Sequence, residues 1–295
     1  MLLLEQLNHT SGLSEGQRTI ARWLVAHRDE MANVTTKEIA RQTFTSPAAV
    51  VRLAKNLSYD GFEPLRRELM AEAAYLNRNF RGVDANRPFD PGDKPLTVAA
   101  KVAALARETA QDTLSLMEAD DLERAVALMA QARVVHVAAT SFPLLYAQDF
   151  QLKMRRLGKM VEVCTLVGEP LFTEGTVDDQ DCAIAISYSG TTPATLEMAR
   201  MYHRRGIPLI ALTSMGCNPL RELADVTLTL TTRERLYSKA GGFTSETSIK
   251  LVLDTLYACY LCQDAERLQA MKDELSSHAE PGRTSDSEIL REAEG

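Results

Sequence analysis

The segment Cys182-Ala-Ile-Ala-Ile-Ser-Tyr-Ser-Gly-Thr-Thr-Pro193 joins an apolar run of strand length to the start of a helical stretch. A strand that feeds directly into a helix is the building unit of a parallel α/β sheet. Free backbone N–H groups and the positive end of the helix dipole meet at such a junction, which suits an anion. Gly190 lets the backbone approach a ligand closely. Donors without charge surround it, on Ser187, Ser189, Thr191 and Thr192.

The hydroxyl-rich turn has a second interpretation, as a simple cap of the following helix. A cap needs only the hydroxyl of Thr192, whereas four hydroxyls and a glycine are present. Ligands of open α/β sheets bind at the carboxyl ends of the strands, where this turn is expected. The pattern therefore favours a binding site for an anionic ligand.

Outward from this turn, the sequence alternates between apolar runs and helical stretches from residue 134 onward. The runs of strand length are 134–139, 160–164, 182–188, 209–213 and 226–230. The helical stretches include 142–157, 193–205 and 245–263. This alternation predicts a parallel α/β sheet.

The first 77 residues show a different, purely helical pattern. Capping boxes at Ser14 and Thr35 predict helices that run to about residues 32 and 42. Ser46 with Pro47 predicts a third helix to about residue 57, and a fourth follows over 64–76. Two short helices joined by a brief turn, with another helix packed ahead of them, are typical of a helix-turn-helix.

The second helix of this pair would enter the major groove of DNA. Arg52 can read a guanine edge or bind a phosphate, while Ser46 and Lys55 suit the phosphate backbone. The predicted outward residues are Ser46, Ala48, Ala49, Val51, Arg52 and Lys55. Spacing alone does not separate this hypothesis from a small helical bundle with ordinary charges on its solvated face.

The segment from Ser46 to Phe62, SPAAVVRLAKNLSYDGF, closely resembles the helix-turn-helix of the RpiR family of bacterial regulators. The family pattern has serine, proline, alanine, threonine, two apolar residues and arginine, and ends in glycine-phenylalanine. Ala49 replaces the usual threonine, which removes a hydroxyl that could touch DNA, and Ser58 replaces a usual glycine. The resemblance extends to about residue 264.

The hydroxyl-rich turn resembles the S-x-S-G-x-T signature of the sugar isomerase (SIS) domain, which binds phosphosugars. This resemblance implies an α/β SIS domain, a flavodoxin-like three-layer sandwich with a parallel sheet, behind an all-α helix-turn-helix bundle. It implies that Ser187, Ser189 and Thr192 bind phosphate through their hydroxyls, beside the backbone of Tyr188 and Gly190.

A serine after the first strand also contributes in SIS domains, and Ser141 matches it. The family's G-x-G before that serine is absent from Val137-Ala-Ala-Thr-Ser141, which narrows the room for a ligand. Glu246, at the start of the last long helix, resembles a catalytic glutamate of amino-sugar isomerases, although dipole stabilisation also explains a glutamate there. We expect the effector to dock between residues 137–141, 187–192 and 239–245, with Lys239 neutralising phosphate charge.

The expected organisation has five parts. They are a helix-turn-helix domain over 1–77, a linker over 78–97, connecting helices over 98–131, a SIS domain over 132–265 and a disordered tail over 276–295. The formal net charge is −7, but residues 1–80 are close to neutral, which permits one DNA-binding end.

Composition and motifs narrow the class of protein further. No run approaches the roughly 20 apolar residues of a membrane span, and the apolar start lacks the basic lead of a signal peptide. Five scattered cysteines suggest no disulfide framework. We therefore expect a cytoplasmic protein without a membrane partner, and no metal site or cofactor is implied.

These features predict a DNA-binding transcriptional regulator of carbohydrate metabolism. Its partners would be operator DNA, a phosphorylated sugar effector and further copies of itself in a homodimer or homotetramer. Two alternatives remain: a phosphosugar isomerase, and a phosphosugar-binding protein that does not act on DNA. The effector, the operator sequence and the direction of regulation stay open.

Overall fold

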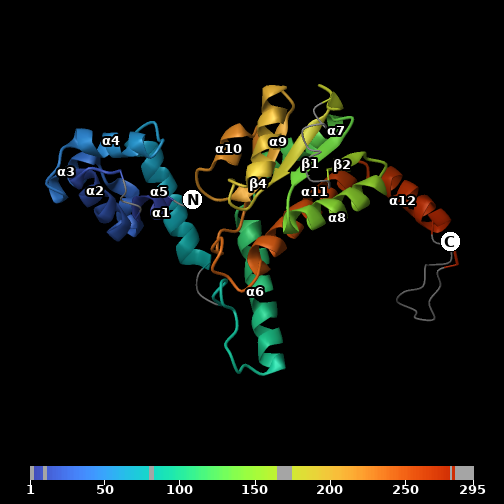
Figure 1. Ribbon diagram of the computed structural model, residues 1–295, viewed down its shortest axis with the longest axis horizontal. Helices are drawn as coiled ribbons and strands as arrows, with labels where there is room; N and C mark the ends of the chain where they lie inside the picture. Colours follow the sequence, from blue (N-terminus) through green and yellow to red (C-terminus); the bar gives the residue numbers. More distant parts are fainter. Residues whose placement is uncertain (1–2, 9–11, 80–82, 165–174, 280, 283–295) are drawn as a thin grey trace.

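The computed structural model describes residues 3–8, 12–79, 83–164, 175–279 and 281–282. Figure 1 shows a bundle of N-terminal helices beside an α/β sandwich. The elements of the bundle are α1 (Leu3–Asn8), α2 (Glu15–Ala26), the 3-10 helix η1 (Arg28–Asn33), α3 (Thr36–Gln42), α4 (Pro47–Asn56) and α5 (Phe62–Asn79).

Helix starts in the bundle follow the capping signals of the sequence. Ser14 and Gln17 form the complete capping box of α2. The Thr35 hydroxyl accepts from the Glu38 N–H at 3.3 Å, but the Glu38 carboxylate binds Arg41 instead of completing a box. At α4, the Ser46 hydroxyl accepts from the Ala49 N–H at 3.2 Å. All three predicted starts are therefore confirmed.

The predicted end of the first long helix is wrong. α2 ends at Ala26, and residues 28–33 continue as the 3-10 helix η1 rather than as α-helix to residue 32. The change lets Met31 turn inward, where its side chain is completely buried. A 3-10 turn is the usual way to tighten a chain that must change direction after a helix.

The bundle core is apolar and includes one buried carboxylate. Ile20, Leu24, Ile39 and Leu53 are fully buried in it, with neighbours from α1 and α5. Glu72 of α5 is also fully buried and accepts the N–H groups of α1, among them that of Leu4 at 3.0 Å. Burial raises the pKa of Glu72 and the backbone hydrogen bonds lower it. Burial has the larger effect, and the pKa is raised to about 7.

The chain then forms a parallel sheet flanked by helices. The elements are α6 (Pro95–Ser115), α7 (Ala119–Gln131), β1 (Val135–Ala139), α8 (Phe142–Arg155), β2 (Val161–Val163), β3 (Cys182–Ile186), α9 (Pro193–Arg204), β4 (Leu209–Ser214), α10 (Pro219–Leu223), β5 (Val226–Leu230), α11 (Phe243–Cys262) and α12 (Ala265–Ala279). The strand order is β2-β1-β3-β4-β5 and every pairing is parallel. This is the flavodoxin-like order, so the predicted fold class is confirmed.

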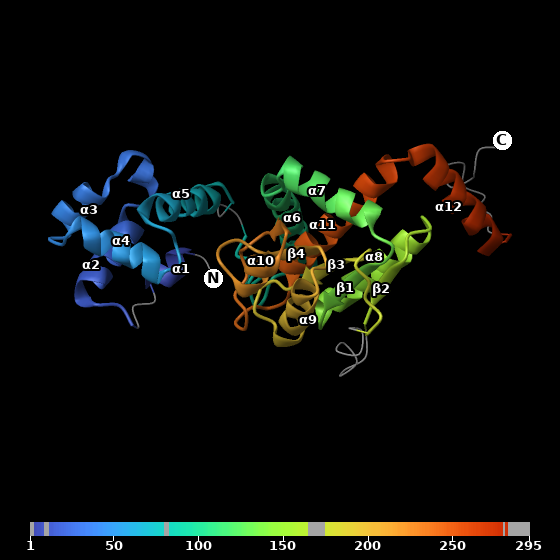
Figure 2. The same cartoon turned by 90° about the horizontal axis from the view of Figure 1, so that it is seen from above.

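Both faces of the sheet are covered, which explains why its central strands are apolar without alternation. One face packs against α7, α8 and α11, and the other against α9 and α10. Figure 2 shows α7 and α9 on opposite sides of the strands. Side chains of β3 divide accordingly: Ile184 and Ile186 face the first layer, while Ala183 and Ala185 face the second.

Three expectations about the remaining segments need correction. α7 contributes Ala125, Val126 and Met129 to the core of the sandwich, so it is a layer helix and not a connector. The expected linker over 78–97 is helical at both ends, because α5 extends to Asn79 and α6 begins at Pro95. α12 reaches Ala279, so the expected disordered tail is helical over its first four residues, 276–279, and most of the remainder lies outside the described residues. Among the described helices, none combines the length and apolar content of a membrane span.

Phe44, in the turn between α3 and α4, provides a test of this local structure. Its φ of 51° lies in the left-handed region and its side chain is 97% exposed. A bulky side chain at such a φ costs about 1–2 kcal/mol, and removing an exposed ring sacrifices no buried area. Phe44→Gly should therefore raise the free energy of unfolding of the bundle by about 1 kcal/mol.

Urea unfolding followed by the fluorescence of Trp23, the single tryptophan of the chain, measures this change within the bundle. Ala48→Gly is the control, because a glycine at an exposed helical position lowers stability by about 1 kcal/mol. Destabilisation by both variants would show that the turn is not strained.

Candidate functional site

The hydroxyl-rich turn lies where the sequence predicted, between the end of β3 and the start of α9. β1 pairs with β3 so that Ala139 lies opposite Ile186. The segment that follows each strand therefore emerges at the same edge of the sheet. This pairing places the turn at Ser141 beside the turn at 187–192.

Hydrogen bonds within the turn join its hydroxyls to one another. The Ser187 hydroxyl lies 2.8 Å from that of Thr192, and it accepts the Thr192 N–H at 3.4 Å. The Ser189 hydroxyl accepts from the N–H and the hydroxyl of Thr191, at 3.2 and 2.8 Å. Thr192 is the N-cap residue of α9, yet its side chain makes no capping hydrogen bond. The helix-cap interpretation of the turn is therefore wrong.

Asn218, the N-cap residue of α10, lies directly against Gly190. Its φ is +65°, and a Cβ there would lie 1.9 Å from Oδ1 of Asn218. Asn218 has no freedom to withdraw, because its side chain accepts from the Arg221 N–H at 3.0 Å and donates to the carbonyls of Ser214 and Gly216. The requirement for glycine thus has two physical causes, the backbone angle and the close approach of Asn218.

Ser141 has an unusual backbone conformation. It has φ 60° and ψ −137° at the N-cap of α8, and its side chain makes no capping hydrogen bond. Non-glycine residues in such sparsely populated regions cost of order 1–3 kcal/mol and cluster at binding sites and switches. The conformation that glycine would normally supply is therefore kept here by a serine.

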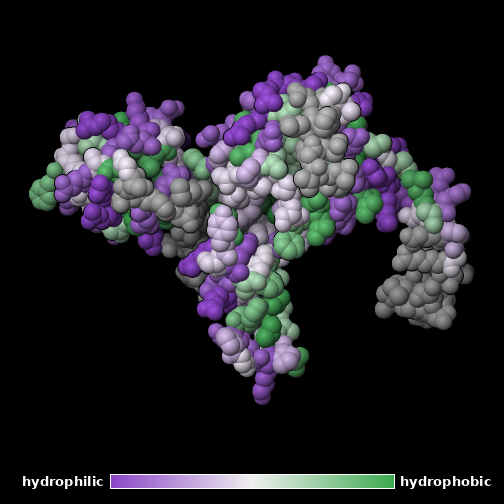
Figure 3. All heavy atoms as spheres, in the orientation of Figure 1, coloured by the Kyte–Doolittle hydropathy of each residue, from purple (hydrophilic) through white to green (hydrophobic). Residues whose placement is uncertain are grey.

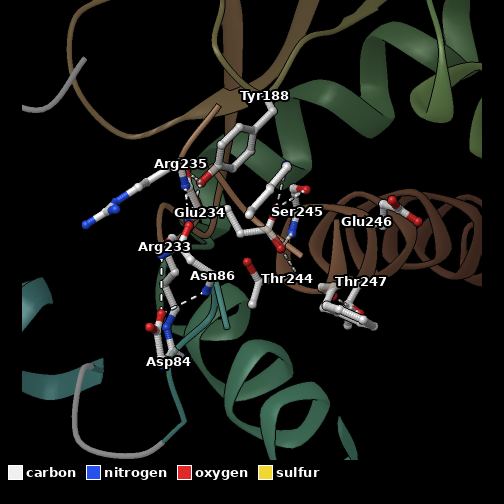
Figure 4. Close-up of polar contacts among 12 residues, drawn as sticks. Asp84, Asn86, Tyr188, Arg233, Glu234, Arg235, Thr244, Ser245, Glu246 and Thr247 are labelled. Atoms are coloured by element: carbon white, nitrogen blue, oxygen red, sulfur yellow. Dashed lines mark hydrogen bonds and ion pairs between the residues drawn. The ribbon is translucent and has the colours of Figure 1, made fainter. Parts of the chain in front are cut away.

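Glu234 is a site residue that the sequence interpretation missed. Its side chain is fully buried, and its carboxylate accepts the N–H of Thr244 at 2.5 Å and the hydroxyl of Ser245 at 2.6 Å. Tyr188 of the turn contacts its backbone: the tyrosine hydroxyl accepts the Glu234 N–H at 2.9 Å and lies 3.1 Å from the Glu234 carbonyl. Figure 4 shows Glu234 between the turn and the start of α11. Only the fold brings these segments together, so no local signal in the sequence marks this residue.

Lys239 does not have the free charge that we expected. Its ammonium group forms an ion pair with Glu234 at 2.8 Å and lies 5.4 Å from the centre of the Tyr188 ring. The positive charge is close to the turn but already compensated by a carboxylate. Any anion at the turn must therefore compete with Glu234 for it.

Glu246 lies apart from the hydroxyls, in a neighbouring groove. The groove has a volume of about 770 Å³ and runs between α8 and α11; its lining includes Phe142, Tyr146, Gly242, Glu246 and Lys250 but none of residues 187–192. The Tyr146 hydroxyl donates to the Glu246 carboxylate at 2.8 Å. Burial, followed by this hydrogen bond, raises the pKa of Tyr146 to about 12.

Helix α4 and its N-cap expose four of the six residues that were predicted to point outward. Val50, Leu53 and Ala54 are buried in the bundle core. Ser46, Ala48, Arg52 and Lys55 are exposed, while Ala49 and Val51 are half-buried. Two basic side chains therefore project from the face of α4 opposite the core.

Profiles of known families match both parts of the chain. A helix-turn-helix domain of the rpiR family matches residues 1–75, and the SIS domain matches residues 128–259. The chain is also 28% identical to the HTH-type transcriptional regulator YbbH of Bacillus subtilis, over 87% of this chain and 88% of that protein. The chain belongs to the RpiR family.

Solved structures agree with the RpiR fold. NanR of Vibrio vulnificus, complexed with ManNAc-6P, superposes with a TM-score of 0.61 at 23% identity, covering 95% of this chain and 100% of that one. The sugar isomerase domain of the RpiR transcription factor of Sphaerobacter thermophilus gives a TM-score of 0.55 at 24% identity, covering 60% and 97%. At these identities the likeness concerns the fold alone.

Ser58 replaces a glycine of the RpiR family and keeps a glycine-like backbone angle. Ser58, at the end of α4, has φ 67°, and the turn between α4 and α5 is intact. The structure thus confirms that this replacement leaves the helix-turn-helix fold in place.

The two constraints on Gly190 can be separated experimentally. Gly206 has a similar φ of +69° but open space around it. Gly206→Ala should cost about 1–2 kcal/mol for the backbone angle, and Gly190→Ala should cost about 1–3 kcal/mol more for the overlap with Asn218. Calorimetric unfolding of both variants measures the difference, and equal losses would mean that Asn218 does not constrain the turn.

Proposed function

We propose that this protein is a transcriptional regulator of carbohydrate metabolism that binds operator DNA and senses a phosphorylated sugar. The observation that carries the proposal is the presence in one chain of a basic reading helix and a hydroxyl-lined turn at the carboxyl ends of parallel strands. The reading helix would bind DNA, and the hydroxyl-lined turn would bind the sugar phosphate that regulates it. Membership of the RpiR family supports the same conclusion.

On the DNA side, α4 enters the major groove with its N-terminal turn leading. Arg52 reads a base edge or a phosphate, and Lys55 binds the phosphate backbone. Ser46 and Ala48 approach the DNA at the helix start. Ala49 contributes little, because it is half-buried and carries no hydroxyl.

On the sugar side, the phosphate binds at the turn. Ser187, Ser189 and Thr192 donate their hydroxyls once the bonds among them are exchanged for bonds to phosphate oxygens. The backbone N–H of Tyr188 and the N-terminus of α9 add further donors, as does the Gly190 N–H once it leaves the Ser187 carbonyl, which it binds at 3.0 Å. The sugar extends from there toward the strained Ser141 and the groove that contains Glu246.

We favour a regulator over an isomerase. The Glu246 carboxylate is engaged with Tyr146 in the groove, and the buried Glu234 carboxylate is engaged with α11 and Lys239. Neither is placed as a free general base beside the hydroxyls in this structure. An isomerase would also have no use for the exposed basic face of α4.

The regulator acts as a homodimer or homotetramer, because reading heads of this kind work in pairs on two half-sites. Several apolar side chains lie exposed on the sandwich, which suits association between copies. Leu96 of α6 is 85% exposed, and Phe142, Leu145 and Leu152 of α8 are about 60% exposed. Figure 3 shows apolar surface along the projecting part of α6.

DNA binding is tested with the double variant Arg52→Ala/Lys55→Ala on the promoter of the protein's own gene cluster. At matched salt, its affinity should fall at least about tenfold, since base and phosphate contacts are lost. The control Arg22→Ala/Arg67→Ala removes the same charge from exposed positions on α2 and α5 and should bind nearly as the parent does. Equal affinities of parent and first variant would show that α4 does not bind DNA.

Sugar sensing is tested by thermal unfolding with ManNAc-6P, glucosamine 6-phosphate, fructose 6-phosphate and ribose 5-phosphate, against the unphosphorylated sugars. One of the phosphates should stabilise the protein by about 2.7 kcal/mol at a hundred times its dissociation constant. Thr192→Val should abolish the shift in melting temperature. Thr255→Val loses a hydroxyl on another helix, α11, and should keep the shift. A shift that survives in Thr192→Val would place the ligand elsewhere, and interconversion of a bound sugar phosphate would favour the isomerase.

A further inference from the structure

The linker between the two parts of the chain is fixed to one loop of the sandwich. We call residues 231–242, which join β5 to α11, the β5–α11 loop. Asn86 of the linker accepts the Arg235 N–H on its side chain at 2.7 Å and donates to the Arg233 carbonyl at 3.3 Å. Its own carbonyl accepts the Ala240 N–H at 2.8 Å. One linker residue therefore binds the loop at three points.

Neighbouring contacts hold the linker on either side of Asn86. Arg233, whose side chain is 2% exposed, donates to the Val83 carbonyl at 3.2 Å and to the Glu108 carboxylate of α6 at 3.2 Å. Further along, the Phe89 ring meets the Phe243 ring edge-to-face at 6.1 Å between centroids. The linker over residues 83–89 is thus an ordered strap, held on the β5–α11 loop and on the first residue of α11.

The same loop contacts the hydroxyl-rich turn. Tyr188 exchanges two hydrogen bonds with the backbone of Glu234, the residue immediately before Arg235. The path from the turn to the linker is therefore Tyr188, Glu234, Arg235 and Asn86, linked by hydrogen bonds and one peptide bond. Figure 4 shows Tyr188 on one side of this loop and Asn86 with Asp84 on the other.

We propose that the β5–α11 loop transmits occupation of the hydroxyl-rich turn to the linker, and that Asn86 is the residue through which the reading head receives it. This inference rests on the proposed function and adds its regulation. Contiguous hydrogen bonds of this kind carry coupling only if the element has two arrangements that the ligand distinguishes. The two arrangements are those in which the Lys239–Glu234 ion pair is formed or broken.

A bound phosphate would bring about −1.5 to −2 charges to the turn. Lys239 lies close enough to Tyr188 to be drawn toward that charge, and its present partner is Glu234. Moving Lys239 removes one of the ligands of the Glu234 carboxylate and leaves those from Thr244 and Ser245. The β5–α11 loop thereby changes its hydrogen bonds near the sugar. The contacts of Asn86 on the other side of the loop change with it.

Hydrogen exchange of the full chain tests the path without any ligand. Tyr188→Phe removes the hydroxyl that binds Glu234, so peptides covering residues 83–94 and 233–242 should exchange faster than in the parent. Tyr146→Phe removes a matched hydroxyl, bound to Glu246 in the groove, and should leave both regions unchanged. If Tyr188→Phe leaves residues 83–94 as protected as in the parent, the proposed path is wrong.

Coupling itself is tested with Asn86→Ala, using the panel member that shifts the melting temperature most. In the parent, this sugar phosphate should change the affinity for the promoter by a factor of about 5–150. Asn86→Ala should bind both partners as the parent does, yet reduce the factor to within about twofold of one. Gln111→Ala, which removes an exposed amide from α6, should keep the full factor.

The outcomes separate the two proposals. Absence of sugar or DNA binding in the parent contradicts the proposed function, whereas the exchange experiment still decides the path. A full coupling factor in Asn86→Ala, with both affinities intact, overturns the role of Asn86. If Asn86→Ala fails to fold, Phe89→Leu replaces it in the coupling measurement, because it weakens the contact of the linker with Phe243.

Discussion

Parallel pairing of β1 with β3 is the constraint on which the rest of the site depends. Because the strands run the same way, each continues into its turn at one edge of the sheet, and the turns at Ser141 and 187–192 become neighbours. The burial of both faces fixes this register, since a slip of one residue would exchange Ile184 with an alanine in two differently filled layers. The position of the hydroxyls is thus a consequence of core packing.

The buried Glu234 carboxylate is the second organising element. A charge without solvent must be compensated by hydrogen bonds and an opposite charge, and here α11, Ser245 and Lys239 provide both. The same residue holds Tyr188 through its backbone. The turn, the start of α11 and the β5–α11 loop therefore form one connected unit rather than three independent segments.

Backbone strain is concentrated at positions related to binding. Phe44 lies in the turn of the helix-turn-helix, Ser58 follows α4, and Ser141 begins α8 beside the hydroxyl-rich turn. All three adopt positive φ without being glycine. At Ser58, the chain keeps a glycine-like geometry where its family usually has glycine, at a cost in stability.

Caps, periodicity and hydroxyl spacing act over a few residues, so the sequence alone established the order of the five strands, the starts of α2, α3 and α4 and the existence of the turn at 187–192. It did not predict α1, α10 or α12. It did not reveal the end of α2, the layer role of α7, or the ion pair that occupies Lys239. Nor did it mark Glu234 as a site residue or Asn86 as the linker residue that binds the β5–α11 loop. Their partners are distant in sequence, and such contacts exist only once the sheet and its loops have been assembled in three dimensions.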